Sequence, residues 1–261
     1  MTAVHSALPV VMCAGVPITA CTRAEAARHV VDLASSPEPS GVDVHLCNAY
    51  TLALADTDPS YRELLRSAAL NFPDGKSVVW ANRLANRDLD LPTERVYGPD
   101  LFHDVLSLGQ AVGLRHYLLG STPEVLTALD ARVRQLYRDA RLVGQDSPPF
   151  RELTEQERAE QVERIRGSGA QIVWVGLGTP KQDREAARLA RELPLVFVAV
   201  GAAFDFVAGT KPQAPLWMQR NGLEWVFRLA SEPRRLWRRY LFGNVRFLYA
   251  AGRQWWRPEP T

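Results

Sequence analysis

The sequence from Gln171 to Gly201, QIVWVGLGTPKQDREAARLARELPLVFVAVG, decides the fold class. Two uncharged apolar runs, Gln171–Val175 and Leu195–Val200, have the length and composition of strands that are buried on both faces. Between them, Lys181–Glu192 has the length and the charge content of a surface helix. A strand, a helix and a second strand in this order predict two parallel strands that are joined by a helical crossover.

The same alternation of short apolar runs and helical segments continues along the rest of the chain. Thr22, for example, is a typical N-cap for a helix over Arg23–Ala34. The other expected strands are Val10–Cys13 with a hairpin return at Ile18–Ala20, then Val42–Cys47, Ala69–Phe72, Arg115–Leu119 and Arg141–Gly144. We therefore predict an α/β fold with a Rossmann-like, largely parallel sheet that has helices on both faces.

Polar and glycine residues follow several of the expected strands. In a parallel sheet, ligands bind at the C-terminal ends of the strands. The residues that stand at such ends are Asn48, Asp74, Ser121, Gly176–Thr179 and Gly201. Because these ends meet at one edge of the sheet, we expect these residues to line a common site.

Composition excludes several classes of function. The 261 residues carry 31 Lys and Arg against 29 Asp and Glu, and this near balance gives no basis for nucleic-acid binding. Cys13, Cys21 and Cys47 are widely spaced, which predicts free thiols in a reducing compartment. No apolar run approaches the ~20 residues of a membrane span. The five histidines are scattered, so we expect no zinc site, and we also expect no other metal or cofactor.

Charge is concentrated in the last part of the chain. Residues 213–261 contain nine arginines and three glutamates, a net charge of +6, whereas residues 1–212 carry a net charge of −4. Five of the seven tryptophans also lie in residues 213–261. We therefore expect an α/β core over 1–212 and a basic, Trp-rich helical appendage over 213–261.

The appendage is expected to contain an amphipathic helix that starts at Ser231 as N-cap, with Glu232 and Pro233 in its first turn. At 100° per residue its arginines fall on one side, namely Arg234, Arg235, Arg238, Arg239 and Arg246. The apolar side holds Leu236, Trp237, Tyr240, Leu241, Phe247 and Leu248. Such a helix suits phosphate groups or an anionic lipid surface. Equally, its apolar side can pack on the core and leave the arginines in solvent.

A glycine-rich turn joins the first strand of the opening unit, Gln171–Val175, to the helix that follows it. Gly176, Gly178 and Thr179, followed by Lys181, offer backbone amides and a helix N-terminus to an anion. Lys181 stands where a dinucleotide fingerprint has its third glycine, so a nicotinamide site is poorly matched. The alternative is a tight turn that binds no ligand.

Two aspartates stand out among the carboxylates. Asp74, in Pro73-Asp74-Gly75, follows a strand and can accept a proton from a substrate hydroxyl, or it can simply stabilise the turn. Asp205, in GAAFDFVAG, follows a buried strand among small and aromatic residues, and we expect it in the wall of the site.

Six motifs together resemble one protein family. They are NFPDGKSVVWANR, RVYGPDL, YLLGSTPEVL, IVWVGLGTPKQD, VAVGAAFDFVAG and APLWMQRNGLEWVFRLASEPRRLWRRYL. In this order they resemble the WecG/TagA/CpsF family of bacterial glycosyltransferases (glycosyltransferase family 26), and the resemblance extends from about Val10 to Leu248.

The resemblance implies an inverting transfer that needs no metal and no other cofactor. The donor would be a nucleotide-sugar, typically UDP-linked, such as UDP-N-acetylmannosamine or a related hexose. The acceptor would be a sugar on a polyprenyl diphosphate, in cell-surface polysaccharide or teichoic-acid-type synthesis. The enzyme would then be cytoplasmic and peripheral on the anionic inner face of the plasma membrane, with its appendage completing the site. The sequence does not exclude a homo-oligomer.

The resemblance also assigns roles to particular residues. Asp74 corresponds to the general base of the family, and Gln182 corresponds to the polar catalytic-site residue of its P-K-Q motif. Asn48 matches an asparagine after the second core strand. The appendage arginines that would meet the diphosphate are Arg228, Arg235 and Arg238.

The chain departs from the family pattern at two positions. Leu46 stands where many members have a threonine, and Asp183 follows the P-K-Q motif where members usually have glutamate. The Leu46 difference leaves the donor and acceptor sugars open.

Two alternative functions account for part of the sequence. An NAD-linked oxidoreductase needs a third glycine and an acidic residue at a strand end about 20 positions further on, and Glu192 does not stand at one. A non-catalytic membrane-peripheral adaptor would use only the basic appendage, which leaves Asp74 and Gln182 without a role.

Overall fold

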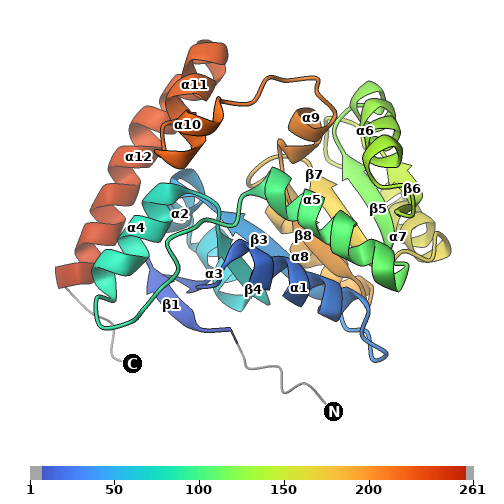
Figure 1. Ribbon diagram of the computed structural model, residues 1–261, viewed down its shortest axis with the longest axis horizontal. Helices are drawn as coiled ribbons and strands as arrows, with labels where there is room; N and C mark the ends of the chain where they lie inside the picture. Colours follow the sequence, from blue (N-terminus) through green and yellow to red (C-terminus); the bar gives the residue numbers. More distant parts are fainter. Residues whose placement is uncertain (1–7, 257–261) are drawn as a thin grey trace.

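The computed structural model describes residues 8–256, and it is a mixed α/β structure (Figure 1). A six-stranded sheet has the order β4-β3-β8-β7-β5-β6, and all of its neighbouring strands pair in parallel. Its strands are β3 (Val42–Cys47), β4 (Leu70–Pro73), β5 (Arg115–Gly120), β6 (Arg141–Asp146), β7 (Ile172–Gly176) and β8 (Val196–Ala199). The Rossmann-like parallel sheet predicted from the sequence is thus confirmed.

The expected N-terminal hairpin is present as a separate two-stranded sheet. Strand β1 (Val10–Cys13) pairs antiparallel with β2 (Val16–Thr19), which begins two residues earlier than the sequence indicated. All three cysteines are free thiols, as predicted, and all three are buried.

Helices cover both faces of the large sheet. One face packs against α1 (Arg23–Ala34), α5 (Gly98–Gly109), α6 (Pro123–Leu136) and α9 (Ala203–Val207), around the fully buried Trp174. The other face packs against α7 (Glu155–Gly167) and α8 (Lys181–Glu192). Side chains alternate between the faces of a strand, so Trp174 of β7 enters the first layer whereas Val173 and Val175 enter the second. This arrangement leaves the C-terminal ends of the strands open.

Three further helices, α2 (Ala49–Thr57), α3 (Pro59–Ser67) and α4 (Lys76–Ala85), lie near the β3–β4 end of the sheet. They share an apolar cluster with the N-terminal hairpin and with the last helix of the chain. A 3₁₀ turn at Gln110–Val112 extends α5.

The C-terminal part forms α10 (Leu216–Arg220), α11 (Glu224–Ser231) and α12 (Pro233–Trp256). In Figure 1 these helices lie at the β4 end of the molecule, with α12 beside α2 and α4. Phe247, Ala250 and Ala251 of α12 are buried against α2 and the hairpin. At Gly243 a Cβ atom would lie 3.2 Å from Cδ2 of Tyr50, so the small residue permits this close approach of α12 to α2.

Ion pairs fasten α12 to the same helix. Arg246 Nε and Arg253 Nη2 both donate to the carboxylate of Asp56, which is almost fully buried. Arg246, predicted on the arginine side of the helix, therefore binds α2 and helps to dock α12 on it.

The predicted capping role of Ser231 is wrong. Ser231 is the last residue of α11, and its hydroxyl donates to the carbonyl of Phe227 one turn earlier at 2.9 Å. An N-cap residue has non-helical backbone angles, whereas Ser231 still belongs to α11, so Ser231 does not cap the next helix. Helix α12 starts at Pro233 instead.

The apolar residues of α12 also divide differently from the prediction. Leu236 and Phe247 are buried, but Trp237, Leu241 and Leu248 are exposed. We call the exposed apolar residues of this helix the outer apolar surface, and they are Trp237, Leu241, Phe242, Val245, Leu248 and Tyr249. Helix α12 thus has two apolar sides, one that packs on the core and one that faces solvent.

Within residues 8–256, the helices are all too short or too polar to cross a membrane.

Candidate functional site

A cavity runs along the C-terminal ends of the large sheet, and we call it the strand-end cavity. It contains eight of the eleven site residues expected from the sequence, namely Asn48, Asp74, Gly176, Gly178, Thr179, Gln182, Asp205 and Arg228. Leu46, Ser121 and Gly201 also line it. Residues from β3, β5, β7 and β8 and the segments after them meet here because parallel strands end at one edge of a sheet.

The glycine-rich turn is held by Gln182. Gly178 has a φ of 79°, which favours glycine, and its amide donates to Oε1 of Gln182 at 3.0 Å. The Gln182 side chain is buried and lies close to Gly201 as well. Gln182 therefore supports the shape of the turn from within, in addition to lining the cavity.

Lys181 lies outside the strand-end cavity. Its ammonium group donates to the carbonyl of Arg151 at 3.4 Å, in the loop that follows β6. It is the first residue of α8, one position before Gln182, and it is exposed.

Asp74 follows β4 and is held by groups from two other segments. Its Oδ1 accepts from the amide of Gly98 at 3.2 Å, and its Oδ2 accepts from Nδ2 of Asn48 at 3.4 Å. Asn48 in turn caps α2, because its Oδ1 accepts from the amides of Tyr50 and Thr51. These contacts point the carboxylate at the cavity with a defined orientation.

Burial raises the pKa of the Asp74 carboxyl above its usual value, because a low-dielectric surrounding disfavours the charged form. The guanidinium of Arg95 opposes this rise, whereas Glu224 adds to it. A carboxylate with a raised pKa is a stronger base, so the environment suits proton acceptance.

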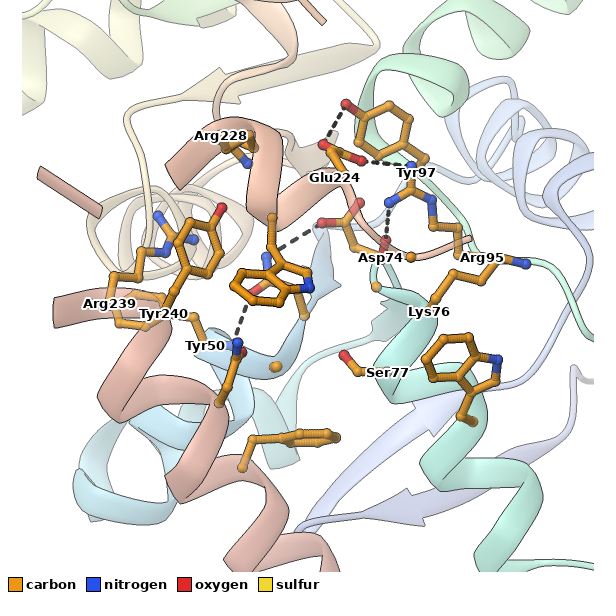
Figure 2. Close-up of a pocket in the computed structure, with 18 of the residues that line it drawn as sticks. Tyr50, Asp74, Lys76, Ser77, Arg95, Tyr97, Glu224, Arg228, Arg239 and Tyr240 are labelled. Carbon is orange, nitrogen blue, oxygen red and sulfur yellow. Dashed lines mark hydrogen bonds and ion pairs between the residues drawn. The ribbon is translucent and has the colours of Figure 1, made fainter. Parts of the chain in front are cut away.

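A network beside Asp74 joins Arg95 and Tyr97 to α11, as Figure 2 shows. Glu224 of α11 accepts from Nη2 of Arg95 at 2.8 Å and from the hydroxyl of Tyr97 at 2.9 Å. Arg95 also stacks on the Tyr97 ring, 4.0 Å from its centroid, and donates to the carbonyl of Asp74 at 3.5 Å. The sequence pattern indicated no role for Arg95 or Glu224, although they lie in the motifs RVYGPDL and APLWMQRNGLEWVFRLASEPRRLWRRYL. The partners are more than 120 residues apart, so local pattern could not pair them.

The arginines of α11 and α12 divide into two groups. Arg228 of α11 and Arg239 of α12 line the strand-end cavity, and Figure 2 shows Arg239 across Asp74 from Arg95. The guanidinium of Arg239 lies over the ring of Tyr50, 4.2 Å from its centroid. Arg238 lies instead over Trp237 and lines a groove next to the outer apolar surface. The side chain of Arg235 lies outside the described residues.

A second cavity adjoins the first at Asp74, and we call it the helix-side cavity (Figure 2). Helices α4, α11 and α12 supply its other walls, which are Lys76, Ser77, Trp80, Trp225, Tyr240, Asn244, Phe247 and Leu248. Asn48, Tyr50, Tyr97, Arg228 and Arg239 line both cavities together with Asp74. The Asp74 carboxylate is thus accessible from two compartments of different chemistry.

A buried charged cluster supports the first turn of α8 beneath the site. His45 of β3 contacts Asp183 through Nδ1 and Asp43 through Nε2, each at 3.0 Å. The Tyr61 hydroxyl donates to the other oxygen of Asp183 at 2.8 Å. Burial lowers the pKa of His45, but the two carboxylates outweigh it and raise the pKa to about 9. The imidazole is therefore protonated at neutral pH and ties α8 to β3.

Among residues 8–256, no group of three or more His, Cys, Asp or Glu side chains is placed to hold a metal ion.

The comparison with known protein families agrees with this geometry. The model of the glycosyl transferase WecG/TagA/CpsF family matches residues 11–261, nearly the whole chain. Such coverage includes the sheet, the glycine-rich turn, Asp74 and the three appendage helices together. Membership implies a nucleotide-sugar donor and a sugar acceptor. The chain therefore belongs to the WecG/TagA/CpsF family of glycosyltransferases.

Proposed function

We propose that this protein is an inverting, metal-independent glycosyltransferase that moves a sugar from a UDP-linked donor to a sugar on a polyprenyl diphosphate. N-acetylmannosamine or a related hexose is the transferred group, and the product serves cell-surface polysaccharide or teichoic-acid-type synthesis. The observation that carries the proposal is the position of Asp74, a carboxylate with a raised pKa that lines two adjoining cavities.

The strand-end cavity suits the donor. It offers the glycine-rich turn and the guanidinium groups of Arg228 and Arg239, which are groups that bind a diphosphate. Its position at the C-terminal ends of a parallel sheet is the usual place for nucleotides in such folds.

The helix-side cavity suits the acceptor sugar. Trp80, Trp225 and Tyr240 give it flat apolar walls, and Lys76 and Asn244 add polar groups. Aromatic faces with a few polar groups are typical of pockets that fix the orientation of a small ligand. Leu248 belongs both to this cavity and to the outer apolar surface, which favours an acceptor that enters from a lipid bilayer.

The reaction then follows from the two compartments. The acceptor hydroxyl gives its proton to the Asp74 carboxylate while its oxygen bonds to the anomeric carbon of the donor. The bond between that carbon and the diphosphate oxygen breaks, and UDP leaves with the electron pair. Attack from the helix side and departure on the strand-end side invert the configuration. Arg228 and Arg239 stabilise the charge that develops on the leaving group.

The outer apolar surface of α12 favours peripheral attachment to the membrane. Its residues are 44 to 68% exposed, and arginines flank them. An exposed apolar stripe beside cationic side chains suits an anionic bilayer surface. We place the protein on the inner face of the plasma membrane, which is in contact with the cytosolic pool of nucleotide-sugars.

A product assay tests the proposal. The full-length protein is mixed with a short-chain polyprenyl diphosphate that bears one sugar, together with each of a panel of UDP-sugars, with and without EDTA. We expect one donor to yield UDP and a product with the mass of one added sugar, also in EDTA. A folded protein that releases no UDP from any donor but binds anionic vesicles would instead be the membrane adaptor.

A further inference from the structure

We propose that Phe150 forms the nucleobase end of the donor site, where the base of the nucleoside diphosphate sugar stacks on its ring. The proposal rests on the proposed function, because it takes the strand-end cavity as the donor site. Phe150 belongs to the loop between β6 and α7, and its ring lines this cavity although 90% of the residue is exposed.

The order of the strands orients the donor. Asp74 follows β4 at one edge of the sheet, and Phe150 follows β6 at the other edge. The cavity between them passes Gly201 after β8, the glycine-rich turn after β7 and Ser121 after β5. Five strand spacings of roughly 4.8 Å separate β4 from β6, a span of roughly 24 Å along the sheet.

Only one direction of binding fits this order. The sugar that is transferred must lie next to Asp74, because the attacking hydroxyl gives up its proton there. The diphosphate then lies near the glycine-rich turn in the middle of the cavity. The nucleoside must consequently extend toward the β5–β6 end, where Phe150 stands.

The loop that carries Phe150 is fastened on both sides of it. Ser147 donates from its hydroxyl to the carbonyl of Ser121 at 2.7 Å. On the other side the Arg151 carbonyl accepts from Lys181, and the Arg151 guanidinium binds both carboxylate oxygens of Glu157 at 2.6 and 2.7 Å. Pro148 and Pro149 restrict the backbone between these anchors.

These contacts hold an aromatic ring at the mouth of the cavity without covering it. An exposed phenylalanine gains no stability from burial, so the ring is available for a ligand. A nucleobase is a flat apolar surface of matching shape, and stacking on an aromatic side chain stabilises it substantially. Lys181, which was expected to bind the substrate, instead donates to the Arg151 carbonyl. It thereby helps to hold the loop that carries Phe150.

Calorimetric titration of the full-length protein with two probes, UDP and inorganic pyrophosphate, tests the inference. Phe150→Ala should weaken UDP binding about 5- to 150-fold, the fold-change that corresponds to the loss of one base–aromatic stack. Pyrophosphate has no base, so its affinity should stay unchanged. Phe150→Trp should restore UDP binding.

Phe242→Ala is the matched control, because Phe242 is another exposed phenylalanine, 64% exposed, that does not line the strand-end cavity. It should bind both probes like the wild type. Equal UDP affinity in Phe150→Ala and wild type would overturn the inference and leave the proposed function intact. An equal loss for UDP and pyrophosphate would also overturn it, since it would show damage to the diphosphate region. A wild type that binds pyrophosphate but not UDP would overturn the inference and the UDP-linked donor of the proposed function together.

Discussion

The two cavities that meet at Asp74 are built in different ways. The strand-end cavity is shaped mainly by glycines and short side chains at the ends of parallel strands, with Arg228, Leu236 and Arg239 added from α11 and α12. The helix-side cavity is shaped by long side chains from α4, α11 and α12, far apart in the sequence. A sheet edge is defined by strand order alone, whereas a wall of helix side chains depends on how each helix is rotated. Local motifs therefore predict the residues of the strand-end cavity. The helix-side cavity depends on packing between distant segments.

Asp74→Asn should have the largest effect, since Asp74 is the residue through which the two cavities act together. The amide cannot accept the proton, so we expect kcat to fall about 10²- to 10⁴-fold. UDP affinity, which depends on the strand-end cavity, should change little. Turnover by product mass and titration with UDP measure the two quantities. Wild-type turnover in a folded mutant would remove Asp74 from the reaction.

Phe247→Ala tests how far the helix-side cavity depends on the packing of α12 against α2 and the N-terminal hairpin. Phe247 is 2% exposed, and truncation of such a buried ring lowers the free energy of unfolding by about 3 to 5 kcal/mol. Phe242→Ala, on the outer apolar surface of the same helix, should change it by less than about 0.5 kcal/mol. The latter should instead weaken co-sedimentation with anionic vesicles. Denaturant unfolding curves and a vesicle assay on both variants distinguish the buried side of α12 from its outer apolar surface. Equal destabilisation by the two substitutions would show that α12 packs on the core in a different orientation.

The buried cluster around His45 should make the free energy of unfolding depend on pH. The folded-state pKa of about 9 lies above the ordinary histidine value of 6.5, so the protonated form is stabilised by folding. This contribution is complete below about pH 6.5 and is lost as the pH rises through about 9, at most about 3 kcal/mol. Asp43, Asp183 and Tyr61 face the imidazole cluster.

Unfolding free energies measured from pH 6 to 10 test this. The wild type should lose stability over that range, and His45→Gln should be less stable at neutral pH but show a flatter profile. A wild-type profile that is flat from pH 7 to 9 would mean that the imidazole is not charged in the fold.

Substitution of the neighbouring arginines Arg238 and Arg239 should give the smallest change in kcat among these variants. Arg239→Ala removes a cation from both cavities, and kcat should fall about 10- to 100-fold, as expected for a lost charge-assisted contact of about 1.5 to 3 kcal/mol. Arg228→Ala should behave similarly. Arg238→Ala, whose side chain lies over Trp237, should keep wild-type kcat. The reverse pattern would show that α12 is rotated relative to the core in the working enzyme.

Local sequence was sufficient for the core. Helices Arg23–Ala34 and Lys181–Glu192 begin and end where the pattern predicts, because capping residues and turn residues act on their immediate neighbours. The positions of Asn48, Asp74 and Gly176 in the strand-end cavity follow from the same local signals, since each comes directly after a strand or completes one. The predicted helix start at Ser231 was wrong because local sequence did not show that α11 extends to this residue. A serine two residues before a proline has the same local pattern whether or not a helix precedes it.

By itself the sequence determined the parallel sheet, the family resemblance and the line of polar residues at the strand ends. Only the tertiary structure decided that Glu224 binds Arg95 and Tyr97, and that Arg239 rather than Arg238 faces Asp74. These two arginines lie 100° apart on α12, and a helical pattern cannot choose between them. The choice is made by Phe247, by Gly243 and by the ion pairs to Asp56, which set the rotation of α12 against α2. Strand ends are fixed by short-range chemistry, whereas the rotation of a helix is fixed by the surface on which it packs.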